Sequence, residues 1–141
     1  MTRGERMIAF LETLRVPEGM HAGQPLVLRP WQREIVRAVY DPVDERGRRI
    51  ARMAVLSVGK KNGKSPLCSG LCLGHLCGPE AIRNGQCYSA AYERDQAGLT
   101  FRYMRQMVEM DQELSERLNV KTATKEIVDP VSGSIFKALS S

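Results

Sequence analysis

The chain has 141 residues, of which 43% are apolar and 26% charged. This length and composition fit one soluble globular domain and exclude an intrinsically disordered protein. No apolar run approaches the ~20 residues of a membrane span, and no signal peptide is recognisable. We therefore expect a cytoplasmic protein. The net charge of +5 favours a polyanionic partner such as DNA or a nucleotide.

The first fifty residues are expected to form a helical lead-in. Apolar residues recur at helical spacing over 4–14, which predicts an amphipathic helix. Residues 16–27 contain two prolines and two glycines and are expected to form a loop. Residues 30–40 form a second predicted helix, because Pro30 suits a first helical turn and a periodic apolar face follows it.

Arginines cluster immediately after this second helix. Two interpretations of the cluster stay open, a solvated hairpin rim or a surface that contacts DNA. Its members are Arg46, Arg48, Arg49 and Arg52.

Residues 51–141 are expected to form a core in which strands and helices alternate. The apolar run at 51–58 predicts its first strand. The further predicted elements are a helix at 64–77, a strand at 86–91, helices at 93–109 and 111–118, and a hairpin of 126–128 with 134–139.

The segment between the first strand and its helix, Gly59-Lys-Lys-Asn-Gly-Lys-Ser65, has the character of a phosphate-binding loop. In such loops backbone N–H groups surround a polyphosphate, a lysine reaches its outer phosphates and a hydroxyl ligates Mg²⁺. The match is partial, because Val58 stands where the first glycine is usual and Pro66 has no N–H to offer. A basic surface turn is the alternative, but the strand–loop–helix context favours a nucleotide site.

These elements together predict an α/β fold. A strand, a phosphate loop, a helix, a second strand and a second helix give a βαβ order. We expect an incomplete, three-layer parallel sheet of the P-loop NTPase type. It would occupy 51–141, behind the helical segment at 1–50.

The four cysteines are expected to be reduced and free of metal. Two of them lie one helical turn apart among leucines, as small buried apolar residues do. Their spacing, even with His75 nearby, does not match paired zinc ligands. They are Cys68, Cys72, Cys77 and Cys87.

With these elements in place, the chain resembles the N-terminal ATPase region of the large terminase subunit of tailed bacteriophages. Four stretches in order carry the likeness, over most of residues 5–141. The segment from Ala22 to Gln32 resembles an adenine-side segment, and that from Val58 to Ser65 a deviant Walker A loop. The other two are Tyr88-Ser-Ala-Ala-Tyr-Glu-Arg-Asp-Gln-Ala97, which resembles the next strand and helix, and Ser132 to Ser141, which resembles a hairpin.

The resemblance implies ATP and Mg²⁺ as ligands. Lys64 would neutralise charge on the β- and γ-phosphates, and Ser65 would hold Mg²⁺. Lys60 is a candidate for sensing the γ-phosphate, with simple solvent exposure as the alternative. The candidate phosphate-binding residues are Gly59, Lys60, Lys61, Asn62, Gly63, Lys64 and Ser65, with Lys64 and Lys60 as the candidate catalytic pair.

The resemblance also implies a place for the base. Gln32 is the candidate for a hydrogen bond to the adenine edge, with Trp31 or Pro30 packing on the ring. A core-filling role is the alternative for Trp31.

One family feature is not found in this sequence. Members continue into an apolar strand that ends Asp-Glu, which supports Mg²⁺ and activates water. Here Ile127-Val128-Asp129 is too short and is followed by a proline within a turn, so we reject it as that motif. The sequence therefore reads as the front portion of an ATPase, and we expect it to be inactive alone.

The partners implied are double-stranded DNA and, in full-length members, the portal and the small terminase subunit. Homo-oligomers are expected only at full length, in the host cytoplasm, and no membrane is expected. Two other classes stay open, another nucleic-acid-dependent P-loop ATPase of helicase-like type and a non-enzymatic basic DNA-binding module.

Overall fold

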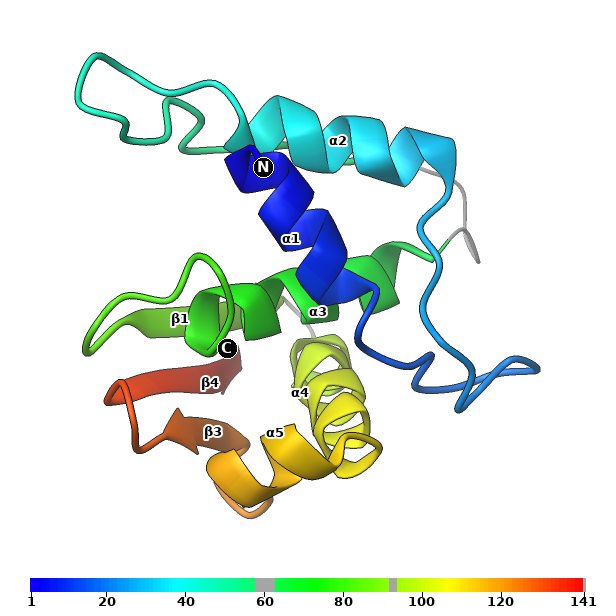
Figure 1. Ribbon diagram of the computed structural model, residues 1–141. Coiled ribbons are helices and arrows are strands. Elements are labelled where there is room, and N and C mark those ends of the chain that lie inside the picture. The colour runs from blue at the N-terminus through cyan, green and yellow to red at the C-terminus, as the bar shows by residue number, and fades with distance from the viewer. Residues whose placement is uncertain (58–62, 92–93, 141) are drawn as a thin grey trace.

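The computed structural model describes residues 1–57, 63–91 and 94–140 (Figure 1). The predicted helix at 30–40 and strand at 86–91 are found with these same bounds. The helix predicted at 64–77 ends one residue earlier, and that predicted at 111–118 is one residue shorter at each end. The helix predicted at 93–109 is described from residue 94, since residue 93 lies outside the described residues. The elements are α1 (Arg3–Leu11), α2 (Pro30–Tyr40), α3 (Lys64–Leu76), β1 (Gln86–Ala91), α4 (Arg94–Glu109), α5 (Gln112–Arg117), β2 (Asn119–Lys121), β3 (Glu126–Asp129) and β4 (Ser134–Ser140).

The sheet has four strands in the order β1-β4-β3-β2. Strand β1 pairs with β4 in parallel, whereas β3 pairs antiparallel with both β4 and β2. The expected parallel sheet is therefore wrong except for one strand pair. The predicted hairpin is confirmed, and β2 extends it by a strand that the sequence pattern did not indicate.

The strand expected at 51–58 is not formed over residues 51–57, and position 58 lies outside the described residues. Met53 and Val55 are 84% and 87% exposed there. A strand depends on ladder hydrogen bonds to a neighbour, and within the described residues no segment pairs with this one. An apolar run alone does not provide those bonds.

Only one face of the sheet is covered within the described part of the chain. Cys87, Phe136 and Ile127 lie side by side in the register and point into the core, where Phe136 and Ile127 are fully buried. Helices α3 and α4 pack against β1 and β4. On the opposite face Tyr88 and Lys137 are exposed. The described elements thus form two layers at the sheet, where three were expected.

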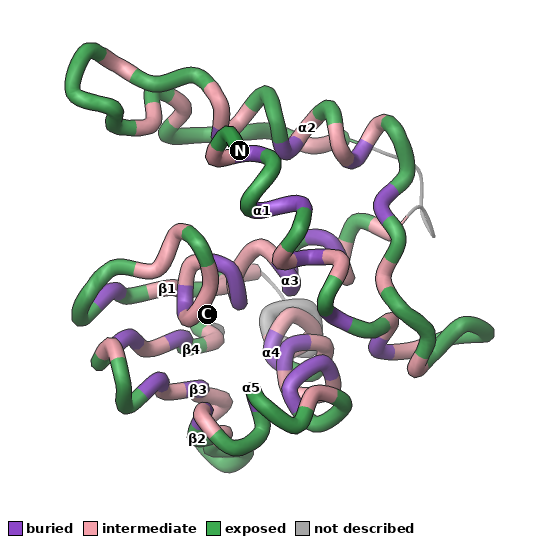
Figure 2. Tube along the Cα trace, in the orientation of Figure 1, coloured by how far each residue is buried: buried purple, intermediate pink, exposed green. Residues whose placement is uncertain are grey.

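Helix α3 lies between the sheet and the N-terminal helices α1 and α2 (Figure 1). Buried residues gather along α1, α3 and α4, where these helices face one another (Figure 2). The core therefore runs without a break from the N-terminal helices to the sheet.

The contact between α1 and α3 depends on glycines in α3. A Cβ on Gly70 would lie 2.7 Å from Cδ2 of Leu11, and one on Gly74 would lie 2.6 Å from Sδ of Met7. Leu11 and Met7 are fully buried. Glycine at these positions allows the two helices to approach more closely than any other residue would.

Helix α1 is held at its start by a capping box. The hydroxyl of Thr2 accepts a hydrogen bond from the N–H of Glu5 at 3.1 Å, and the N–H of Thr2 donates to the Glu5 carboxylate at 3.0 Å. The helix was expected over 4–14 but ends at Leu11. Leu14 lies beyond it and is still buried, so its periodic spacing does not indicate helix.

Replacing Gly74 with Leu should lower the free energy of unfolding by about 3 kcal/mol, because the added side chain overpacks the contact with Met7. Urea unfolding followed by circular dichroism measures the change. The matched control is Ala38→Leu, which adds a leucine to an exposed position of α2. A Gly74→Leu variant as stable as this control would show that α1 does not need the close contact.

Candidate nucleotide-binding site

Gly63 places the start of α3. Its φ of 77° and ψ of 17° lie in the left-handed region that favours glycine. A Cβ at this position would lie 3.1 Å from Nε2 of Gln32, so space is also restricted there. Backbone conformation and packing thus both select glycine at the residue before the helix.

The first turn of α3 is open to an anion. Gly63 has no side chain to cap the helix, and Pro66 has no N–H. Within the described part of the chain, the N–H groups of Lys64 and Ser65 meet no hydrogen-bond acceptor. Unsatisfied N–H groups and the positive end of the helix dipole together favour a bound phosphate.

The side chains that follow Gly63 lie at the surface. Lys64 is exposed and Ser65 is half-buried, while the carbonyl of Ser65 accepts a 2.8 Å hydrogen bond from the hydroxyl of Ser69. That hydrogen bond, between two residues of α3, stabilises the first turn of the helix. Gly59, Lys60, Lys61 and Asn62 lie outside the described residues, and their roles stay predictions.

Gln32 comes to this site from α2, 31 positions earlier in the chain. It is only 6% exposed, and its Oε1 accepts a 2.8 Å hydrogen bond from the N–H of Arg29. Its Nε2 is the amide group that faces Gly63. The structure therefore brings together Gln32 and Gly63, near the end of the segment predicted to be a phosphate loop.

A cavity of about 310 Å³ lies beside this pair. Its walls are mostly apolar and come from the loop between α1 and α2, with Leu26 and Leu28 among them, and from Pro66 of α3. Gln32 and Arg29 supply polar groups. Its volume and lining are those of a small-ligand pocket.

Pro30 and Trp31 do not line the cavity, although they precede Gln32 directly. Pro30 is exposed and Trp31 is half-buried. Trp31 is not a buried core residue either, so neither sequence-based role for it is seen here.

The cysteines are less buried than their spacing suggested. Cys68 is exposed, which contradicts its expected place in the core, and the other three are half-buried. Burial raises the pKa of the Cys72 thiol to about 12 and that of Cys77 to about 11. The described residues include no group of three or more His, Cys, Asp or Glu that could hold a metal.

Asp129, the acid rejected above as a catalytic residue, has a structural partner. Its fully buried carboxylate accepts hydrogen bonds from Nε and a terminal nitrogen of Arg117, at 3.0 and 2.7 Å. The hydroxyl of Ser132 and the N–H of Val131 donate to it as well. Burial by itself would raise the pKa of Asp129, but these hydrogen bonds bring it below its ordinary value. Both carboxylate oxygens are therefore already occupied.

Asp129→Asn should lower the free energy of unfolding at pH 7 by about 2 kcal/mol, because half-exposed Arg117 loses its counter-charge. Since the folded-state pKa is lowered, this contribution is present above the ordinary carboxyl pKa and is lost as the pH falls below about 4. Urea midpoints measured from pH 7 to pH 3 should therefore converge for the two proteins. Glu45→Gln, at an exposed carboxylate, is the control. A gap that does not narrow between pH 7 and pH 3 would contradict the assignment.

The fold and the site define a mixed α/β domain with a helix N-terminus open to an anion and a pocket beside it. The family profile of the terminase large subunit, ATPase domain, matches residues 30–141, and the chain belongs to this family.

Two comparisons agree with this membership. The large terminase subunit of Enterobacteria phage HK97 is 42% identical over 141 residues, which cover 99% of this chain and 27% of the relative. The crystal structure of the HK97 bacteriophage large terminase superposes with a TM-score of 0.87 at 40% identity, over 99% of this chain and 28% of that chain. The chain thus spans between a quarter and a third of the length of the relatives it matches.

Among the helices in the described segments, none is both long and apolar enough to cross a membrane.

Proposed function

We propose that this chain forms the ATP-binding part of a DNA-packaging motor of the terminase type, which couples ATP hydrolysis to DNA translocation in longer members. The observation that carries the proposal is the start of α3 after Gly63, which no side chain of the described residues caps, beside a cavity that Gln32 also lines. Gln32 and the start of α3 lie within the region matched by the ATPase family profile, which supports ATP as the ligand.

Each residue of the site has a role in this proposal. The N–H groups of Lys64 and Ser65 donate to phosphate oxygens, and the Lys64 ammonium neutralises the β- and γ-phosphates. The Ser65 hydroxyl is the candidate Mg²⁺ ligand. When bound there, Mg²⁺ would neutralise part of the phosphate charge. Lys60 stays a candidate for sensing the γ-phosphate.

The base side of the site is assigned to the cavity. Because Oε1 of Gln32 already accepts a hydrogen bond from Arg29, its Nε2 is left to donate to the adenine edge. The apolar side chains from the loop between α1 and α2 provide a surface for the ring. This places the base against Leu26 and Leu28, where the sequence suggested Trp31 or Pro30.

The wider assignments follow from the same proposal. The sheet, with β1 parallel to β4 and α3 after the loop, is assigned to the P-loop NTPase type. Double-stranded DNA is the proposed substrate, with the portal and the small terminase subunit as partners of longer members. The proposed location is the host cytoplasm.

Lys64→Ala should weaken MgATP binding roughly 30- to 150-fold, because it removes a charge-assisted contact worth ~2–3 kcal/mol. Isothermal titration calorimetry measures the two affinities. Lys121→Ala removes an exposed lysine from β2 and is the matched control. Equal affinity of wild type and Lys64→Ala would refute the site.

The 141-residue chain should hydrolyse ATP far more slowly than ~1 per second, a usual enzymatic rate. No carboxylate is among the described residues that line the cavity, and Asp129 is held by Arg117. Loss of a positioned base costs about 10²–10⁴ in rate. Steady-state phosphate release measures the rate, with Lys64→Ala as the control for contamination. Turnover near ~1 per second that vanishes in this variant would reveal a catalytic acid in the chain.

A further inference from the structure

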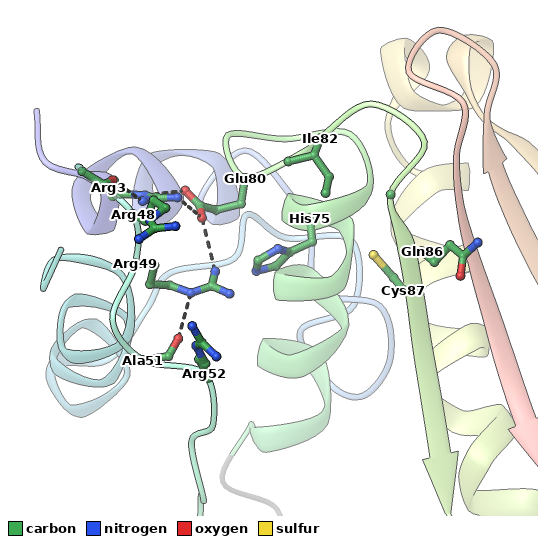
Figure 3. A pocket seen from close by; sticks show the side chains of 12 residues that line it. Arg3, Arg48, Arg49, Ala51, Arg52, His75, Glu80, Ile82, Gln86 and Cys87 are labelled. Atoms are coloured by element: carbon green, nitrogen blue, oxygen red, sulfur yellow. Dashed lines mark hydrogen bonds and ion pairs between the residues drawn. The ribbon is translucent and has the colours of Figure 1, made fainter. Parts of the chain in front are cut away.

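A second hollow in the molecule is lined by arginines. Its volume is about 520 Å³, and it lies between the hairpin that follows α2, the end of α3 and the start of β1 (Figure 3). Four arginines and one carboxylate line it. They are Arg3, Arg48, Arg49, Arg52 and Glu80.

Two of these arginines are fixed by Glu80. Its carboxylate, only 5% exposed, accepts hydrogen bonds from Nε and a terminal nitrogen of Arg3, at 3.0 and 2.8 Å, and from Arg49 at 3.3 Å. Arg49 also lies over the ring of Tyr40 and donates to the carbonyl of Ala51. The single acid is therefore fully engaged, and an excess of positive charge remains in the pocket.

The other two arginines are available to a ligand. Arg48 is 67% exposed and its one ion pair is with Asp44 at the surface, a contact that another anion can readily replace. Arg52 is exposed and makes no hydrogen bond or ion pair within the segments that the structure describes. The hairpin that carries Arg48 is held together by Asp44, whose Oδ1 accepts from the N–H groups of Arg46 and Arg48 at 2.9 Å, and Arg52 follows directly after this hairpin.

No other group in the pocket cancels this charge or adds to it. His75 points toward Arg49 (Figure 3), and its Nε2 lies 2.8 Å from the hydroxyl of Tyr40. Burial, followed by the charge of Arg49, lowers the pKa of His75, so it is neutral near pH 7. Gln86 and Cys87 form the opposite wall without charge.

The pocket is separate from the nucleotide site. His75 lies eleven residues after Lys64 in α3, which corresponds to about 16 Å along the helix axis. The two pockets share no lining residue.

We propose that this arginine pocket binds backbone phosphates of duplex DNA. Arg48 and Arg52 make the phosphate contacts. The positive charges of Arg3 and Arg49, which Glu80 fixes in position, add to the attraction. Guanidinium groups match phosphate oxygens in geometry and charge. An ordered hairpin at the surface that carries several arginines suits an extended polyanion, because phosphates can contact it along its length. The proposal relies on the function given above only for choosing DNA among polyanions.

The test compares the Arg48→Gln/Arg52→Gln double variant with Arg15→Gln/Arg37→Gln, which removes the same charge at exposed positions away from the pocket. Fluorescence anisotropy with a labelled 20-base-pair duplex, without ATP, gives affinity as a function of salt. The Arg48→Gln/Arg52→Gln variant loses two phosphate contacts. For this variant the slope of the logarithm of the DNA association constant against the logarithm of the salt concentration should therefore be smaller in magnitude by about 1.8. The pocket variant should also bind at least ten times more weakly than wild type at low salt, and the control should stay within about threefold.

Three outcomes would overturn the proposal: no DNA binding by wild type, equal losses in both double variants, or a reduced MgATP affinity in the pocket variant. Circular dichroism verifies that each variant is folded. Because ATP titration and DNA titration are separate measurements, a failed DNA result with intact Lys64-dependent ATP binding rejects this pocket and leaves the proposed function standing.

Discussion

The close contact between α1 and the glycines of α3 is the constraint on which the rest of the structure depends. Without side chains at Gly70 and Gly74, the backbone of α3 can approach Leu11 and Met7 directly. Helix α3 is thereby held between the N-terminal helices and the sheet. Both proposed ligand sites lie at ends of this one helix, so their positions follow from its packing.

The N-terminal helices contribute residues to both proposed sites as well as to packing. Helix α2 carries Gln32 to Gly63, and α1 carries Arg3 to Glu80. Each contact joins a residue of the first forty to one beyond position 60. The helical lead-in therefore supplies residues to two proposed sites that the α/β portion could not form alone.

Local signals predicted much of the fold. Pro30 and the apolar face after it gave α2 its bounds, and the turn around Gly133 gave the hairpin. The capping box formed by Thr2 and Glu5 can be recognised in the sequence and could have predicted where α1 begins. The prediction that failed was the strand over residues 51–57. These residues have the composition of a strand, but a strand also needs a neighbouring strand to pair with, and the sequence pattern does not show whether one is there.

The candidate site shows the same division. Gly63, Lys64 and Ser65 were proposed from the sequence because a phosphate loop needs those residue types in order, and Gln32 was proposed through a family likeness. Periodicity did not predict the cavity beside Gln32, since most of its walls come from a loop, although most of its lining belongs to the segment 22–32 that the family likeness had placed on the adenine side. The partner of Asp129 was missed for a related reason, because an ion pair across twelve residues leaves no local pattern.

Pro66 changes how much of the attraction for phosphate at the proposed site comes from backbone N–H groups and how much comes from side-chain charge. A loop that binds phosphate through many backbone dipoles keeps its affinity for phosphate as salt is added, because short-range hydrogen bonds are little affected by ions in solution. Here one of the first-turn dipoles is missing and Lys64 is exposed. On the proposed function, more of the attraction comes from a solvent-facing charge, which mobile ions weaken over a Debye length of about 10 Å at 0.1 M. Ionic strength would then act as a control on how often this domain carries its nucleotide.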